Sequence, residues 1–356
     1  MSIVSCAKVK DKTTDIKDVF KAVAKAMKLA HWERYVKGKN IVLKVNVVWD
    51  RMYPSCTTTP MVIEGVLKVL RSSKKHKNST ITIVDTDTAA IMNADKSFKV
   101  QGIEKMVEKY NAKVVNLTHT DFKVVSFKKA LVLKNLKISK VLLNADTIIT
   151  MPVLKTHSYS GMTGALKNQW GCIHDLRHNH HMVLSKAIAD VNNFFKGKIT
   201  FAVMDALFGM DGQGPKTGNP RKVGYIFASS DRVSLDAAAC SVMGLDLDTV
   251  KHIKYAQEVG IGTTKYKVVG DKLPSFKFTP ADTSNIVMAT EMWLRHRGPW
   301  LEKIIFDGKS PLLTIMRWSA KYYYDLWYLV IGKKNADKMM KTNFGRIWKK
   351  NYLSNI

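Results

Sequence analysis

Short apolar runs typical of strands alternate along this chain with segments of helical period, and this alternation limits the fold more than any other feature. Residues 40–48 and 81–85 have the pattern of buried strands. Residues 15–30 and 59–72 space their apolar side chains at three and four positions, and Pro60 stands at a favoured first helical position. The alternation predicts an α/β fold, with mixed or parallel sheets and flanking helices in two lobes.

The length of 356 residues is about twice that of an ordinary domain. Pro274 and Pro280 mark a linker after the last predicted strand and helix. We therefore expect an N-terminal α/β lobe over 1–150, a second α/β lobe over 151–270 and a helical extension over 271–356. Further strands are predicted over 112–116, 123–136, 145–151, 199–205 and 223–228, and further helices over 101–110 and 231–243.

The extension has helical patterns over 287–306 and 310–331 and is crowded with Trp and Tyr, with several lysines after residue 332. A helix with an apolar side and basic flanks can lie in a membrane interface, which makes 310–350 a candidate membrane contact. We prefer the other interpretation, a cover on the α/β body, since aromatic stripes at helical spacing are usually core.

The charge is unbalanced, with 57 Lys and Arg against 29 Asp and Glu and a net charge of +28. The electric field of so large a positive charge attracts polyanions, acidic membrane surfaces and small anionic substrates. The basic residues are spread over the whole length and no RGG tract, zinc finger or RNP signature organises them. A small anion is therefore favoured over nucleic acid as the partner.

The four cysteines are far apart and form no C-x-x-C pair, which argues against a disulfide scaffold, a zinc ribbon and a ferredoxin-type cluster. Such cysteines suit a reducing cytosol. The first residues reach a charge at Lys8 without a long apolar run, so no signal peptide is predicted. We expect a cytoplasmic protein, with a peripheral place at a membrane as the alternative.

Residues 145–181 hold the densest group of polar and small side chains. A predicted strand is followed by the residues Lys-Thr-His, which end at His157. The carboxyl end of a strand is where open α/β sheets bind ligands. His157 is a candidate general acid or base. Lys167 can act as an anion clamp, a Schiff-base amine or a covalent tether for a cofactor. Gly161 and Gly164 would let the backbone approach a ligand closely.

Other groups leave two interpretations open. His174, His178, His180 and His181 could ligate a transition metal or begin a solvated helix. Asp205, Asp211 and Asp236 could bind a divalent cation, although we favour capping roles for them. The loop 212–221, with Lys216 and Arg221, would suit phosphate or carboxylate. The alternative for His157 and Lys167 is a surface loop with one hydrogen-bonded His and one solvated Lys.

Several short motifs follow one another in a fixed order. They are Lys44-Val-Asn46, Thr57-Thr-Thr-Pro60, the Lys-Thr-His of 155–157, Thr-Gly-Ala-Leu-Lys-Asn at 163–168, Gly-x-Gly-Pro at 212–215 and Ser-Leu-Asp-Ala at 234–237. Together they resemble the domain of unknown function 362 family over roughly 38–265. Members often carry a cysteine-rich ferredoxin-like segment, which this chain lacks, so no Fe–S cluster is expected.

The run from 145 to His157, then Gly-x-Thr-Gly-x-x-Lys ending at Lys167 and a later His, is more distantly similar to the nickel-pincer lactate racemase family. The resemblance implies proton transfer by His157, a cofactor tether at Lys167 and a nickel ligand at His180 or His181. The racemases have a second catalytic His where Asp85 and Asp87 stand here, and Ala165 replaces a glycine of their loop. Racemisation from two faces is therefore in doubt.

These features predict an enzyme, isomerase-like or oxidoreductase-like, that acts on a small carboxylate or phosphate by acid/base chemistry in a cleft between the lobes. A Lys-tethered or metal cofactor such as nickel is an option. The rival hypothesis is a basic binding protein for RNA or an anionic membrane surface. The predicted site residues are His157 and Lys167 for catalysis; Lys167, Gly161, Thr163, Gly164 and Asn168 for a cofactor; Lys44, Asn46, Thr58, Lys155 and Arg221 for substrate; and His180 and His181 for a metal.

Overall fold

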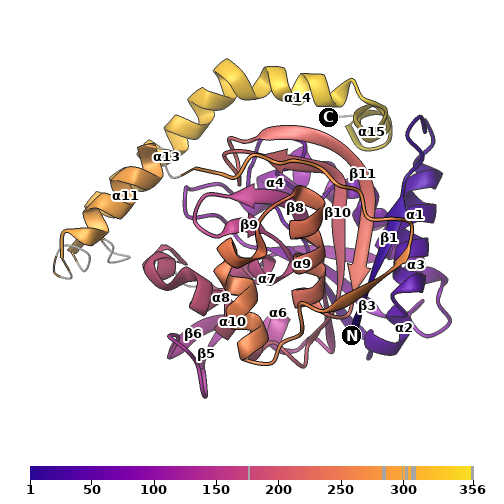
Figure 1. The fold of residues 1–356 in the computed structure, drawn as a ribbon, viewed down its shortest axis with the longest axis horizontal. Coiled ribbons are helices and arrows are strands. Elements are labelled where there is room, and N and C mark those ends of the chain that lie inside the picture. The colour runs from indigo at the N-terminus through magenta and orange to yellow at the C-terminus, as the bar shows by residue number, and fades with distance from the viewer. Residues whose placement is uncertain (175–176, 283–285, 299, 301–303, 306–309, 354–356) are drawn as a thin grey trace.

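Ten strands form one mixed sheet at the centre of the molecule (Figure 1). The computed structural model describes residues 1–174, 177–282, 286–298, 300, 304–305 and 310–353. The strands of the sheet are β1 (Ser2–Lys8), β2 (Asn40–Lys44), β3 (Thr80–Asp85), β4 (Ala112–Asn116), β7 (Thr147–Thr150), β8 (Val153–His157), β9 (Gly161–Thr163), β10 (Ile199–Asp211), β11 (Asn219–Ser229) and β12 (Tyr266–Gly270).

The strand order is β12-β1-β11-β10-β7-β2-β3-β4, and β8 branches off to pair with β10 and β9. From β10 to β4 all neighbours run parallel, whereas β11 is antiparallel to both β10 and β1. The α/β fold with a mixed sheet is thus confirmed. Strands from 1–150 and from 151–270 join this same sheet, and the division into domains at these boundaries stays a prediction.

Helices cover both faces of the sheet, because neighbouring side chains of its parallel strands point to opposite sides and both sides are apolar. Leu43 packs in the core on one face of the sheet, while Val42 packs in the core on the other face. The helices are α1 (Ile16–Leu29), α2 (Trp32–Tyr35), α3 (Pro60–Ser72), α4 (Ala94–Val100), α5 (Ile103–Glu108), α6 (Lys140–Leu143), α7 (Ala165–Asn168), α8 (Leu184–Phe194), α9 (Arg232–Met243), α10 (Lys251–Glu258), α11 (Ile286–His296), α13 (Pro311–Trp327), α14 (Lys333–Met340) and α15 (Asn343–Trp348).

Most predicted elements of the body lie within a few residues of their expected positions. Helix α9 begins as its sequence indicates, with the Asp231 carboxylate accepting hydrogen bonds from the backbone of Val233 and Ser234. It ends at Gly244, whose φ of 70° is the left-handed conformation that favours glycine. The region predicted as strand over 123–136 is a separate hairpin of β5 (Phe122–Ser126) and β6 (Asn135–Ser139). Strands β1 and β12 were not predicted.

The C-terminal helices arch over the body, from α11 and α13 to α14 (yellow in Figure 1), before α15 inserts into the core. Helix α13 continues as a short π-helical turn, η5 (Tyr328–Gly332). Trp327 and Tyr328 pack on Trp49 and Tyr53 of the body. The preferred interpretation as a cover is confirmed for this face. The predicted helix over 287–306 is α11 as far as His296, and part of the remainder lies outside the described residues. None of the helices within the described ranges is long and apolar enough to cross a bilayer.

Candidate functional site

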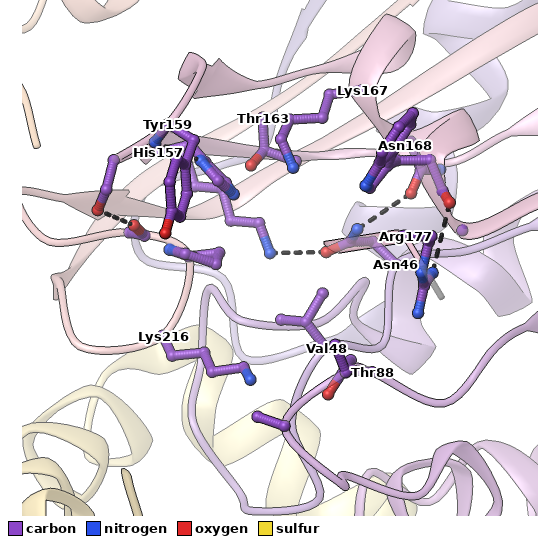
Figure 2. Close-up of a pocket in the computed structure, with 18 of the residues that line it drawn as sticks. Asn46, Val48, Thr88, His157, Tyr159, Thr163, Lys167, Asn168, Arg177 and Lys216 are labelled. Carbon is purple, nitrogen blue, oxygen red and sulfur yellow. Dashed lines mark hydrogen bonds between the residues drawn. The ribbon is translucent and has the colours of Figure 1, made fainter. Parts of the chain in front are cut away.

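A pocket of about 210 Å³ lies where parallel strands of the sheet end (Figure 2). Its wall includes Lys44 at the end of β2, Asp85 at the end of β3 and His157 at the end of β8. Ala320 and Tyr324 of α13 complete it from the C-terminal side. The carboxyl edge of parallel strands is the usual ligand site of open α/β sheets, because loops diverge there and leave a crevice.

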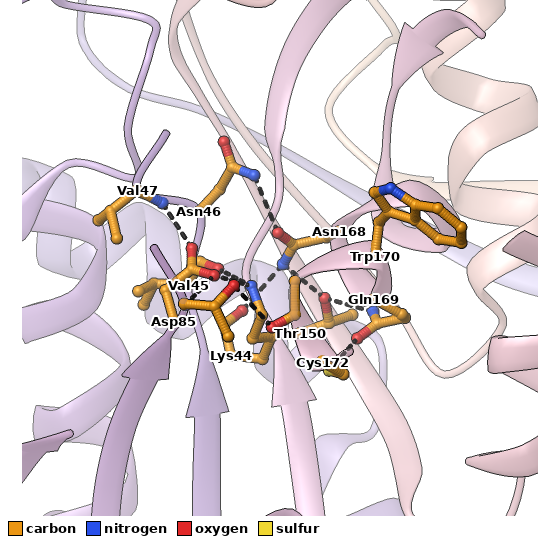
Figure 3. Close-up of polar contacts among 12 residues, drawn as sticks. Lys44, Val45, Asn46, Val47, Asp85, Thr150, Asn168, Gln169, Trp170 and Cys172 are labelled. Atoms are coloured by element: carbon orange, nitrogen blue, oxygen red, sulfur yellow. Dashed lines mark hydrogen bonds and ion pairs between the residues drawn. The ribbon is translucent and has the colours of Figure 1, made fainter. Parts of the chain in front are cut away.

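Part of the pocket wall is a buried ion pair within a network of polar contacts (Figure 3). Lys44 Nζ lies 2.8 Å from Asp85 Oδ1, and the two side chains are almost fully buried. Asp85 Oδ2 also accepts a hydrogen bond of 2.7 Å from the Val47 backbone. A Cβ on Gly171 would stand 2.6 Å from Asp85 Oδ1 and 2.7 Å from Lys44 Nζ, so only glycine fits beside this pair.

Two asparagines connect this ion pair to the next lysine. Asn168 Nδ2 donates to the Lys44 backbone oxygen and to Thr150 Oγ1, both at 2.9 Å. Asn46 Nδ2 donates to Asn168 Oδ1 at 3.0 Å, and Asn46 Oδ1 accepts from Lys155 Nζ at 2.6 Å. All these side chains are buried, so their positions are fixed by bonds within the protein.

Besides Lys44, four cationic side chains line the pocket, those of Lys155, Lys167, Arg177 and Lys216. Lys167 Nζ makes no hydrogen bond or ion pair within the described part of the chain, and burial together with the Lys155 and Arg177 charges lowers its pKa to about 7. Burial also lowers the pKa values of Lys155 and Lys216 to about 8. Arg177 Nη1 donates to Thr86 Oγ1 at 2.7 Å. Lys216 Nζ lies 4.7 Å from the centre of the Tyr324 ring.

His157 is neutral, because burial and then the neighbouring charge of Lys167 hold its pKa well below the usual range. The backbone N–H of Tyr159 donates to His157 Nδ1 at 3.1 Å. An Nδ1 that accepts a hydrogen bond carries no proton, so the proton of the neutral ring is on Nε2. Toward a bound molecule His157 therefore offers a hydrogen-bond donor at Nε2.

The histidines of the predicted cluster have separate surroundings. His174 contacts the backbone of Thr118 and the ring of Phe122, and His180 meets Trp170 edge to face. His181 lines the pocket, and its Nδ1 lies 2.9 Å from Glu291 Oε1. The side chain of His178 lies outside the described residues. Over the described ranges, no three or more His, Cys, Asp or Glu side chains gather as a metal site.

The structure brings together most, but not all, of the predicted site residues. Lys44, Asn46, Lys155, His157, Thr163, Lys167, Asn168 and His181 all line the pocket. Thr58 stands behind it, donating to the Met151 backbone, and Arg221 lies elsewhere, paired with Asp211 at 3.1 Å. Gly161, Gly164 and His180 are not among the lining residues.

The backbone at Gly164 is closely approached by another residue of the protein, Asp236, and not by the pocket. A Cβ there would stand 2.2 Å from Asp236 Oδ1, and this carboxylate accepts hydrogen bonds from the backbone of Ala165 and Leu166. Asp205 similarly accepts from the Thr59 backbone at 2.7 Å. Both aspartates thus have the capping roles that we favoured, and burial raises the pKa of Asp236 to about 7.

Sequence reasoning did not assign Asp85, Arg177, Glu291 or Tyr324 to the site. Lys216 was noted only as part of a basic glycine-rich loop, and it is this lysine, not Arg221, that reaches the pocket. Asp85 carried a usable signal, since it is the last residue of the predicted strand 81–85, whose counterpart in the structure pairs with β2. No local signal identifies Glu291 and Tyr324, because long-range packing brings them to the pocket.

Comparison with known families matches residues 41–241 to the domain of unknown function (DUF362). The match covers more than half of the chain, and the protein therefore belongs to this family. This membership confirms the resemblance seen in the ordered motifs.

Among curated proteins, the thylakoid-associated protein sll1697 of Synechocystis is 25% identical over 243 residues, which cover 64% of this chain and 70% of that protein. Among solved structures, a Thermotoga maritima protein aligns with a TM-score of 0.38 and 13% identity over 70% of this chain and 59% of its own. The lactate racemase apoprotein of Thermoanaerobacterium thermosaccharolyticum aligns with a TM-score of 0.37 and 16% identity over 67% and 56%. The chain thus spans less than two thirds of either solved structure.

Proposed function

We propose that the protein is an enzyme that holds a small carboxylate or phosphate in this pocket and transfers a proton to or from it. The observation that carries the proposal is the surplus of positive side chains around one cavity, Lys155, Lys167, Arg177 and Lys216. The two lining carboxylates are already paired, Asp85 with Lys44 and Glu291 with Arg295. A surplus of cations around one cavity favours binding of an anion.

The proposed roles follow from the protonation states. Lys216 and Arg177 bind the anion, and Lys155, held by Asn46, adds its charge nearby. Lys167, with a pKa of about 7, is in part a neutral amine at neutral pH and can take a proton from the bound molecule. His157 offers its Nε2 proton to an oxygen on which negative charge develops. Lys167 is thus the base in this scheme and His157 the donor.

A Lys-tethered cofactor stays a prediction, and two features of the pocket are compatible with it. Lys167, the expected tether, and His181, one of the two expected nickel ligands, line the same cavity. The contact between His181 and Glu291 is the kind that orients a ligating imidazole. Intact mass and metal content of protein from its native host test this option, since a mass excess at Lys167 with about one nickel per chain is expected only for a tethered nickel cofactor.

The test of the anion site is calorimetric titration of the purified protein with inorganic phosphate. We expect saturable binding that weakens about tenfold or more in Lys216→Met, because a charge-assisted contact is lost. Lys113→Met is the matched control, an exposed lysine on the outer strand β4 that should leave binding unchanged. Equal binding in both variants, or no binding by the wild type, would contradict the proposal.

Lys167 has a separate test, labelling at neutral pH with pyridoxal 5′-phosphate followed by borohydride reduction. A near-neutral amine beside cations should react with this phosphate-bearing aldehyde ahead of the exposed lysines. Peptide mapping that finds the label spread over surface lysines, with Lys167 unmodified, would remove Lys167 from the proposed chemistry.

The rival hypothesis of a basic binding protein has a distinct signature. Binding to RNA would weaken steeply with salt, because neutralised phosphates release counterions. The proposed enzyme should show little affinity for an oligonucleotide at moderate salt. The Synechocystis relative is named a thylakoid-associated protein, which supports the membrane version of this alternative.

A further inference from the structure

We infer that the outer face of α13 and η5 is a membrane-binding surface that lies flat on anionic lipid, with the lysines of α14 beside it. This inference goes beyond the proposed enzyme and does not depend on it. It rests on the two faces of one helix, on their exposure and on the charges that follow.

Apolar side chains line the face of α13 and η5 that points away from the body. Those of Leu312, Ile315, Trp318, Tyr322, Leu326 and Leu329 are between 44% and 67% exposed. At ~100° per residue these six positions fall within an arc of roughly 120°, as an amphipathic helix requires. No Asp, Glu, Lys or Arg stands within this arc from 312 to 332. We call these six residues the outer stripe.

The opposite face of the same helix is already engaged. Arg317 Nε donates to the Ala89 backbone at 2.7 Å, and Asp325 pairs with Lys321 and with Arg51 of the body. Tyr324 lines the pocket. The body thus contacts one side of α13 and leaves the apolar side in contact with water. Contiguous exposed apolar surface of this kind marks an interaction site.

The charges beside the stripe identify the partner. Residues 328–341 contain four lysines, at 333, 334, 338 and 341, against the single Asp337. The four lysines are exposed. An apolar stripe with Trp and Leu followed by clustered lysines matches a lipid interface, where the acyl boundary takes the stripe and acidic headgroups attract the lysines. The clustered lysines favour a negatively charged partner. A protein partner would not need to be negatively charged, whereas an anionic bilayer presents negative charge over any area.

The experiment is co-sedimentation of the full chain with vesicles of phosphatidylcholine alone or mixed with an equal amount of phosphatidylglycerol. We expect binding to the mixed vesicles, weaker binding to phosphatidylcholine alone, and weakening by salt. Ile315→Glu and Leu326→Glu should each reduce the partition coefficient about tenfold or more, because each removes buried apolar area and adds a charge.

Val124→Glu is the matched control, the same kind of change at a valine that is 64% exposed on the β5–β6 hairpin. It should leave vesicle binding unchanged. Point substitutions serve better than deletion, because removing residues 310–356 would also remove Trp348 from the core. Circular dichroism of each variant confirms that it is folded, and substitutions at exposed positions should not disturb packing.

Two results would overturn the inference. One is that the wild type binds neither vesicle, or that the Ile315→Glu and Leu326→Glu variants bind as well as the wild type. The other is a wild type that light scattering shows to be an oligomer while both variants are monomers, since the stripe would then be the contact between two copies of the chain. Anion binding by the pocket is measured without lipid, so failure here leaves the proposed enzyme standing.

Discussion

Two lysines that line the pocket are in opposite electrostatic situations. Lys44 is buried against Asp85 at 2.8 Å and shares a polar network with Asn46 and Asn168. Lys167 has no such partner among the described residues, and its pKa falls to about 7. The first lysine is stabilised by an ion pair within the protein, whereas the second loses affinity for its proton.

The difference teaches that a buried lysine alone does not indicate function. A lysine with a carboxylate partner contributes to the architecture around it. A lysine among other cations loses affinity for its proton and becomes reactive. The following experiments test whether Lys44 and Lys167 differ in this way.

The largest effect is expected for Asp85→Asn, which keeps the shape of the side chain and removes the charge opposite Lys44. A buried ammonium without its partner should lower the free energy of unfolding by about 3–5 kcal/mol. Urea unfolding followed by circular dichroism measures it. Asp248→Asn is the control, because this exposed carboxylate is in no ion pair of the described structure. A loss no greater than in the control would mean that the ion pair does not stabilise the protein.

A smaller loss is expected for Asn46→Ala, which removes the contacts to Lys155 and to Asn168. Leaving buried partners without a hydrogen bond should lower the free energy of unfolding by about 1–3 kcal/mol. Asn135→Ala on the hairpin removes one exposed contact, to Ser126, and should change stability by less than about 0.5 kcal/mol. If the two variants were equally stable, the network would not be what positions Lys155.

An effect of the opposite sign is expected for Lys167→Met. Below about pH 7 the lysine is charged in both the folded and the unfolded chain, and the folded state disfavours that charge. The variant should therefore be at least as stable as the wild type at pH 6. As the pH rises from about 7 toward the unfolded pKa of 10.5, only the unfolded wild type keeps the proton, so wild-type stability rises relative to the variant.

Urea midpoints of both proteins at pH 6 and pH 9 measure this difference. Lys155 and Lys216 titrate in both proteins, so their contributions largely cancel. A Lys167→Met variant that is less stable than the wild type at pH 6 would show that this lysine has a stabilising partner and belongs with Lys44.

The body of the fold could be predicted because its signals are local. Helix α9 has its cap residues at both ends, and strands β2 and β3 are short apolar runs. Strand β1 was missed although it lies between β11 and β12, because its residues Ser2–Lys8 show no clear alternation. The place of β1 is fixed by pairing with residues more than 200 positions away, which a local pattern does not contain.

For the site, the sequence located the strand end that holds His157 and the loop that leads to Lys167. It did not determine the tautomer of His157, which depends on one backbone contact from Tyr159. Nor could it separate Lys216 from Arg221 within one loop, since the fold directs the first to the pocket and the second to Asp211. The residue types of the site were thus predictable, but the directions in which their side chains point were not.

The C-terminal helices are attached to the body at both ends. Before them Phe278 is buried against the sheet, and after them Trp348 and Tyr352 are buried in the core, where Trp348 also donates to the Gln101 backbone. Helix α13 therefore behaves as the middle of a closed loop. If its contacts with the pocket break, the two attachments keep Tyr324 at a high effective concentration near Lys216, and return is an intramolecular event. The wall that α13 gives the pocket is thus held from both sides by buried attachments that are far apart in the sequence.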